Sequence, residues 1–120
     1  MFEEKRQSIR VKKPLSVQFG IEKKDGSVSW DMSLIRDISE TGICLRANTL
    51  MEKDTICHLK LKVPIRPSEA LELIGKVVSS EESRTNVYEA RLTFVGLNET
   101  QKEYLREYIA WVLVNERGEK

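Results

Sequence analysis

Apolar and polar residues alternate along most of this chain, and that period of two is the feature that most limits its fold. Successive side chains of a β-strand point to opposite faces, so alternation predicts strands with one buried face. The clearest run is residues 27–34, where Val28, Trp30, Met32 and Leu34 alternate with Ser and Asp. Further alternating runs predict about five more strands, in residues 11–22, 43–47, 56–63, 71–77 and 88–94.

Turn signals separate these runs. Asp25-Gly26 is a dipeptide that suits a two-residue hairpin turn between the first two strands. Ile35 breaks the alternation and indicates a bulge or a strand end. Residues 79–86 are polar, so we expect a loop there.

The apolar period changes to a helical one near the C-terminus. Asn98 and Gln101 have the spacing of a helix capping box. The residues after them recur on one helical face: Tyr104, Leu105, Tyr108, Ile109, Trp111 and Val112. Strands in series followed by one helix favour a small antiparallel barrel or sandwich, with Trp30 and Trp111 in the core or at the helix contact. We expect a mobile arm in residues 1–10 and one domain in residues 11–117.

Composition restricts the possible partners. The chain has 120 residues, of which 40% are hydrophobic, which is enough for one core without disulfides. A net charge of +1 argues against binding a long polyanion, although the basic residues in 1–13 suit a small anion. Cys44 and Cys57 fit a reducing compartment. With no signal peptide and no apolar run of about 20 residues, we expect a cytoplasmic protein without membrane insertion.

Enzyme and metal chemistry find little support in the sequence. One histidine, His58, and two cysteines provide too few ligands for a structural zinc site. The lone His58 on a lysine-rich strand face also argues against a Ser-His-Asp triad. We therefore expect no metal, no cofactor and no enzymatic activity.

Two short segments carry the candidate binding residues. The segment Asp37-Ile38-Ser39-Glu40-Thr41-Gly42 lies between two strand runs and is either a tight turn or a corner that points Asp37 and Ser39 at a ligand. Arg6 and Arg10 lie four residues apart on the arm. They are either solvated charge or two planar guanidinium groups that match phosphate oxygens.

In this order, Arg6-Gln7-Ser8-Ile9-Arg10 and the Asp37–Gly42 segment resemble the two motifs of the PilZ domain family. Those motifs are Arg, three residues, Arg; and Asp or Asn, any residue, Ser, two residues, Gly. The resemblance covers nearly the whole chain, including a glycine-bearing strand at residues 75–78 and the closing strand and helix after residue 88. It implies a six-stranded antiparallel split β-barrel with a C-terminal α-helix that binds cyclic diguanylate (c-di-GMP).

The resemblance also implies roles for the motif residues. Arg6 and Arg10 would hold phosphates and contact guanine, and Asp37 would accept hydrogen bonds from guanine N–H groups. Ser39 would add a hydroxyl contact, and Gly42 would let the backbone approach the ligand without a Cβ. Three further basic residues are expected near the ligand: Lys5, Arg36 and Arg91. Lys5 tolerates a second anion, which weakly favours two stacked ligand molecules over one.

The expected output is a surface that changes when the arm docks on the barrel and thereby regulates a protein partner. In this family such partners belong to flagellar, pilus or exopolysaccharide machinery, and the sequence does not choose among them. The main alternative is a PilZ-like interaction module that binds no nucleotide. A small nucleic-acid-binding barrel is a second alternative, which the nearly neutral charge disfavours.

Overall fold

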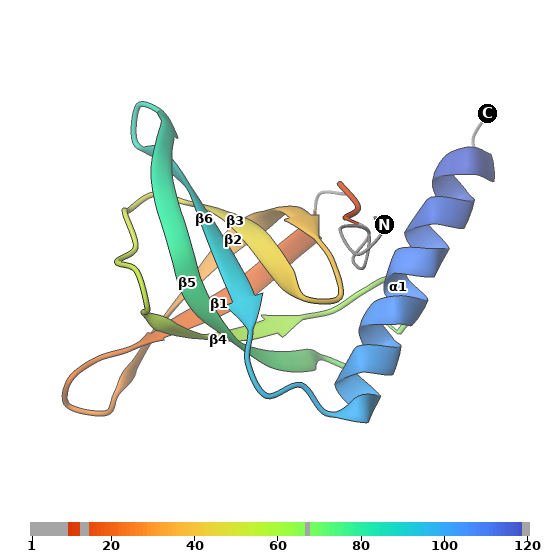
Figure 1. The fold of residues 1–120 in the computed structure, drawn as a ribbon, viewed down its shortest axis with the longest axis horizontal. Helices are drawn as coiled ribbons and strands as arrows, with labels where there is room; N and C mark the ends of the chain where they lie inside the picture. Colours follow the sequence, from red (N-terminus) through yellow and green to blue (C-terminus); the bar gives the residue numbers. More distant parts are fainter. Residues whose placement is uncertain (1–9, 13–14, 67, 119–120) are drawn as a thin grey trace, which may run out of the picture.

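The computed structural model describes residues 10–12, 15–66 and 68–118, with only the backbone described in 116–118. These residues form a closed barrel of antiparallel strands followed by one helix (Figure 1). The elements are β1 (Leu15–Glu22), β2 (Val28–Ile38), β3 (Gly42–Ala47), β4 (Ile56–Leu61), β5 (Leu71–Arg84), β6 (Val87–Phe94) and α1 (Glu99–Gly118). The strand order around the barrel is β1-β2-β3-β6-β5-β4. The predicted six-stranded barrel with a C-terminal helix is confirmed.

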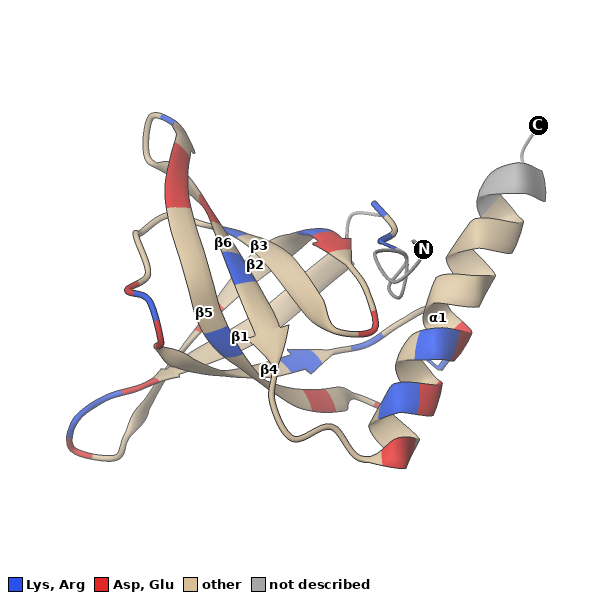
Figure 2. Cartoon of the chain, viewed as in Figure 1, with Lys and Arg blue, Asp and Glu red and all other residues tan. Residues whose placement is uncertain are grey.

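Alternation fills the barrel as expected along β4, where Cys57, Leu59 and Leu61 are buried between more exposed neighbours. Inward side chains of the other strands complete the core: Val17, Phe19, Ile35, Ile43, Leu45, Leu73, Val77, Ala90 and Leu92. Charged residues of both signs are spread over strands and helix (Figure 2), in keeping with the small net charge. Within the described part of the chain, no helix is both long enough and apolar enough to cross a membrane.

The β1–β2 turn is longer than predicted. Lys23 N–H donates to the Ser27 carbonyl at 2.8 Å, which leaves residues 24–26 in a three-residue loop. Gly26 has a φ of 90°, a left-handed conformation that explains the glycine. The Asp-Gly dipeptide therefore predicted the hairpin correctly but the loop length wrongly. A three-residue loop that ends in a left-handed residue also needs a glycine, so the dipeptide does not distinguish it from a two-residue turn.

The apolar side of β2 faces outward along its first half. Trp30, Met32 and Leu34 are 45%, 58% and 47% exposed, so the expectation of Trp30 in the core was wrong. Alternation identifies a strand but not which of its faces is buried. The β1–β2 hairpin extends past the barrel end (Figure 1), where both faces of β2 meet solvent.

The polar residues 79–84 form a strand, where a loop was predicted. They belong to β5 and pair with β6, with Ser80 opposite Ala90 and Glu82 opposite Tyr88. This β5–β6 hairpin projects beyond the barrel (Figure 1), so most of its side chains are exposed and the usual apolar alternation is missing. Only residues 85 and 86 separate the two strands, and Asn86 has a φ of 60°.

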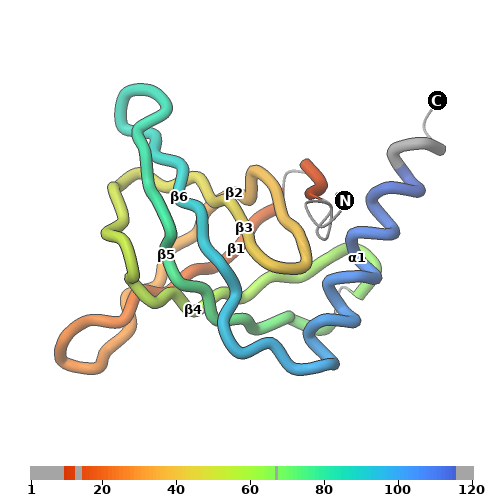
Figure 3. The backbone as a smooth tube through the Cα atoms, in the orientation of Figure 1, coloured from red at the N-terminus to blue at the C-terminus, as the bar shows by residue number. Residues whose placement is uncertain are grey.

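Helix α1 begins with the predicted capping box. Asn98 N–H donates to Gln101 Oε1 and Gln101 N–H donates to Asn98 Oδ1, both at 2.8 Å. The predicted apolar face is buried at Tyr104, Leu105, Tyr108, Ile109 and Val112, and Trp111 is partly buried against the same core. The helix is thereby fixed on the barrel, beside the connection that follows β2 (Figure 3).

Candidate functional site

Ser39 is the residue that closes the β2–β3 turn. Its side chain is fully buried, and its Oγ accepts hydrogen bonds from the backbone N–H groups of Thr41 and Gly42, each at 3.1 Å. Ser39 N–H in turn donates to the Gly42 carbonyl at 2.9 Å. The hydroxyl therefore points into the turn, in agreement with the tight-turn interpretation of this segment, because a short polar side chain can satisfy nearby backbone donors.

Gly42 lies where two strands come unusually close. A Cβ added at this position would be 2.5 Å from the Leu92 carbonyl oxygen of β6, closer than real Cβ atoms come. The same Cβ would lie 3.6 Å from Arg10 Nη2. A glycine is thus required by the barrel itself, and its bare backbone leaves room for the Arg10 guanidinium above it.

A β-bulge determines the face of the barrel on which Asp37 lies. The β2–β3 register shifts between Ile35 and Asp37, as the break at Ile35 predicted. Ile38 then lies opposite the core residue Ile43, and Asp37 lies opposite Cys44 on the outer face, where it is nevertheless buried. Asp37 Oδ1 accepts a hydrogen bond from Arg10 Nη1 in a charge-assisted pair. The Asp37 side chain is 5% exposed and that of Arg10 is 40% exposed, so the pair has one buried end and one open end.

The backbone also joins the end of the arm to this corner. Val11 N–H donates to the Ile38 carbonyl at 2.9 Å, and Ile38 N–H donates to the Val11 carbonyl at 3.1 Å. Figure 3 shows the first described residues (red) beside the β2–β3 connection. The last residue of the first motif, Arg10, and the second motif are therefore in contact, as their combined use in one site requires. We call Arg10, Asp37, Ser39 and Gly42 the motif corner.

The other residues predicted to contact the ligand are Lys5, Arg6, Arg36 and Arg91. Lys5 and Arg6 fall outside the described residues. Arg36 follows Ile35 in the bulge, and its Nη1 donates to Glu89 Oε1 of β6 at 2.9 Å. Arg91 is exposed on β6 and is paired in register with Cys44 of β3. Burial and then the Asp37 carboxylate raise the pKa of the Cys44 thiol, while the Arg91 guanidinium opposes them.

A contact that the sequence did not reveal links the turn to the helix. Arg106 Nε of α1 donates to Glu40 Oε1 at 3.3 Å, across 66 positions of sequence. A hollow of about 570 Å³ lies between the turn and the helix and is lined in part by Thr41, Thr93 and Lys102. The second motif accepts any residue at the position of Glu40, so the motif does not predict its partner, which only the folded chain identifies.

The motif corner offers binding chemistry. Asp37 is an acceptor for N–H donors, and the guanidinium of Arg10 is a planar donor for phosphate or for the O6 and N7 atoms of guanine. Among the described residues, no group of three or more His, Cys, Asp and Glu is arranged to hold a metal ion. The arrangement suits an anionic ligand with N–H edges.

Barrel, terminal helix and motif corner together define a PilZ domain. The family model described as "PilZ domain" matches residues 4–111, and the chain belongs to this family. No curated protein matches the sequence.

Solved PilZ structures share the fold at low sequence identity. The chain is similar to the Bacillus subtilis inhibitor of motility (MotI/DgrA), with a TM-score of 0.75 and 19% identity over 93% of this chain and 53% of that one. It is similar to the PilZ domain with c-di-GMP of YcgR from Escherichia coli, with a TM-score of 0.70 and 12% identity over 95% of both chains. The K. pneumonia MrkH–c-di-GMP complex gives a TM-score of 0.72 and 14% identity over 96% of this chain and 55% of that one. The chain thus spans about half the length of the B. subtilis protein.

Proposed function

We propose that this PilZ domain is a receptor for c-di-GMP and acts by binding, without catalysis. The observation that carries the proposal is the contact between Arg10 and Asp37, which brings the end of the first motif onto the second. Family membership supports it, as do two similar structures that are described with c-di-GMP. The ligand has two phosphates for guanidinium groups and two guanines whose N–H edges suit a carboxylate.

Each motif residue takes a role that its environment favours. Asp37 accepts from the guanine N–H edge, since a carboxylate is the stronger acceptor for such donors. Arg10 and Arg6 bind phosphate and the O6 and N7 atoms of guanine. Ser39 and Gly42 shape the corner. The Ser39 hydroxyl accepts hydrogen bonds within the turn, and Gly42, which has no Cβ, leaves space above the backbone. Lys5, Arg36 and Arg91 stand as further candidate contacts.

Binding in this scheme exchanges one partner of Asp37 for another. In the ligand-free corner the carboxylate is held by Arg10. The guanine N–H groups donate to the Asp37 carboxylate and replace the Arg10 guanidinium there. The Arg10 side chain, which is 40% exposed, can then turn to the ligand. Residues 1–10 act as an arm that orders over the ligand and loses conformational entropy, which charge-assisted contacts of about 1.5–3 kcal/mol each offset.

The output is a change at the surface around the arm. A cytoplasmic partner in flagellar, pilus or exopolysaccharide machinery would read that change, and the fold itself does not distinguish these. The Glu40–Arg106 contact gives the corner a direct connection to α1, so the helix is the element next in line to respond.

Calorimetric titration with c-di-GMP tests the proposal. We expect Arg10→Ala and Asp37→Ala to weaken binding at least tenfold, because each removes a charge-assisted contact of about 1.5–3 kcal/mol. Arg84→Ala is the matched control, since Arg84 is an exposed arginine in the projecting β5–β6 hairpin and its loss should leave the affinity unchanged. Cyclic diadenylate should not compete, because its Watson–Crick edge lacks the N1–H donor of guanine.

The alternative, an interaction module that binds no nucleotide, predicts a different result. A ligand present at a hundred times its dissociation constant raises the free energy of unfolding by about 2.7 kcal/mol. No thermal shift of the unmodified protein at saturating c-di-GMP would favour the alternative. Equal affinities of the wild-type, Arg10→Ala and Asp37→Ala proteins would contradict the site.

A further inference from the structure

The first half of β2 is paired with another strand on one side only. β1 pairs with β2 from Leu15 opposite Ile35 to Glu22 opposite Val28, whereas the pairing with β3 begins only at Leu34. In the described part of the chain, residues 28–33 therefore present an open strand edge. An edge of that length extends about 20 Å, at a rise of about 3.3 Å per residue. Open edges are templates on which another extended chain can pair.

The hydrogen-bond phase of the β1–β2 hairpin shows which groups face that edge. Lys23 N–H donates to the Ser27 carbonyl, and hydrogen-bonded pairs alternate with non-bonded pairs along an antiparallel ladder. By this alternation Ser29, Asp31 and Ser33 bond across to β1.

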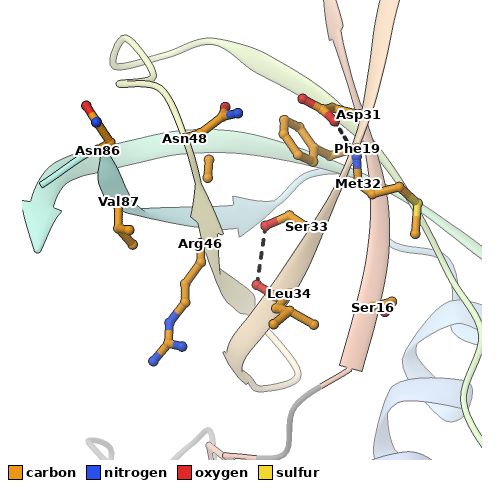
Figure 4. A pocket seen from close by; sticks show the side chains of 11 residues that line it. Ser16, Phe19, Asp31, Met32, Ser33, Leu34, Arg46, Asn48, Asn86 and Val87 are labelled. Atoms are coloured by element: carbon orange, nitrogen blue, oxygen red, sulfur yellow. Dashed lines mark hydrogen bonds between the residues drawn. The ribbon is translucent and has the colours of Figure 1, made fainter. Parts of the chain in front are cut away.

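The backbone groups of Trp30 and Met32 consequently point to the open side. An independent contact agrees, because Met32 N–H donates to the neighbouring Asp31 Oδ1 at 2.8 Å and so is not used in the ladder to β1 (Figure 4). A solvent-exposed carboxylate that occupies an edge N–H is easily displaced, since water can solvate it once it leaves.

An open hollow of about 430 Å³ lies beside this edge, where β2 and β3 diverge (Figure 4). The β2 edge forms one wall, and the end of β3 and the start of β6 form the other. The residues of that second wall are Arg46, Ala47, Asn48, Asn86 and Val87. The edge thus borders a hollow in which an extended segment can lie.

The outer face of β2 beside the edge is apolar and held in place. Trp30, Met32 and Leu34 are exposed there. The Trp30 ring has Lys60 Nζ 4.8 Å from its centroid, and a Cβ added at Gly20 would lie 2.9 Å from its Cδ2 atom, so the indole lies against β1. Side chains of a strand added beside β2 would pack on these residues at every second position.

We propose that residues 28–33 of β2 form a docking edge for an extended segment of a partner protein. The segment adds as a strand in the hollow, displaces the Asp31 carboxylate from Met32 N–H, and pairs with the free backbone groups of Trp30 and Met32. Its alternate side chains are apolar, to pack on Trp30 and Met32. The segment also carries a carboxylate at the position that faces Arg46. The Arg46 side chain is 47% exposed and its ion pair with Glu89 is long, with Nε 3.8 Å from the carboxylate, so the guanidinium can bind a second carboxylate. This docking edge does not depend on nucleotide binding.

A peptide selection tests the docking edge. A phage-displayed library of random twelve-residue peptides is selected against the full chain, and the selected peptides are synthesised and titrated. We expect apolar alternation with an acidic residue in the selected sequences. Bound peptide should slow amide hydrogen exchange of Trp30 and Met32 at least tenfold, with smaller changes at the motif corner.

Two variants of one residue separate backbone from side-chain contributions. Met32→Pro removes the edge N–H but keeps the bonds to β1, since Met32 belongs to a non-bonded pair. It should weaken peptide binding at least tenfold, whereas Met32→Ala, which keeps the N–H, should weaken it less than threefold. The melting temperature of each variant verifies folding.

N-methylation of the peptide backbone tests strand pairing without any change in the protein, so the test does not depend on whether Met32→Pro folds. N-methylation should abolish binding at alternate peptide positions and have little effect at those between, which is the signature of strand pairing. The proposal is overturned if no peptide is selected, if the peptides protect amides elsewhere, or if methylation shows no alternation.

Discussion

Removal of the Ser39 hydroxyl would separate two explanations for a motif serine. In Ser39→Ala the Gly42 N–H, which is buried, loses the acceptor it holds at 3.1 Å. The Thr41 N–H loses an acceptor at the same distance, but this residue is exposed and water can replace it. A buried backbone donor without an acceptor costs about 1–3 kcal/mol, so the free energy of unfolding should fall by about that amount.

Urea denaturation followed by circular dichroism measures this loss. The urea midpoint should fall while the slope of the transition stays unchanged, because the native barrel buries the same surface. Ser83→Ala is the matched control: Ser83 Oγ donates to the Val87 carbonyl at 3.2 Å on the exposed hairpin. Its effect should stay within about 0.5 kcal/mol.

The opposite result would refute the reasoning. If Ser39→Ala unfolds at the same urea concentration as Ser83→Ala, the two hydrogen bonds to Ser39 Oγ do not stabilise the turn. If the same variant also loses c-di-GMP affinity, the hydroxyl contacts the ligand directly, and the corner must open before binding.

Two further results are expected. Gly42→Ala should lower the free energy of unfolding by about 1–3 kcal/mol or more, because its Cβ would lie 2.5 Å from the Leu92 carbonyl oxygen; calorimetry would show a lower melting temperature. Burial raises the pKa of the Cys57 thiol to about 11. The folded state therefore holds this proton more tightly than the unfolded chain, so the protein should lose stability between about pH 9 and 11. An aromatic disulfide reagent at pH 8 should react at least tenfold more slowly with Cys57 in folded Cys44→Ala protein than in urea.

The barrel was predictable wherever one face of a strand is buried. β4 shows this best, because Cys57, Leu59 and Leu61 alternate with polar residues and lie inside. Prediction was incomplete in the two hairpins that project from the barrel: the strand at residues 79–84 was missed, and the strand at residues 28–34 was predicted but the burial of Trp30 was wrong. Residues 79–84 have no buried face to impose alternation, and the alternation of residues 28–34 belongs to the outer face. The strand at residues 79–84 is determined by its pairing with β6, which a single sequence does not display.

The motif corner was predictable in identity and only partly in geometry. Spacing selected Asp37, Ser39 and Gly42 as one unit, and the structure places Arg10 against them. The sequence left the direction of the Ser39 hydroxyl open, because a serine in a turn can bond either the backbone or a ligand, and the structure shows the bond to the backbone. The Glu40–Arg106 contact was beyond reach, since it depends on how the helix lies across the barrel.

The bulge near Arg36 explains how one strand serves two surfaces. Well before it, Trp30 and Met32 point outward along the open strand edge. After it, Ile38 points inward and Asp37 lies on the outer face, where β3 pairs with β2. Without the register shift, Arg36 would lie opposite Cys44, and Asp37 would take the inward position opposite Ile43 in the apolar core. Deletion of Arg36 should therefore leave Asp37 opposite Cys44 in a regular ladder, so that the Arg10–Asp37 contact and the docking edge are both kept. The corner and the edge thus lie on one strand, and each is free to bind without the other.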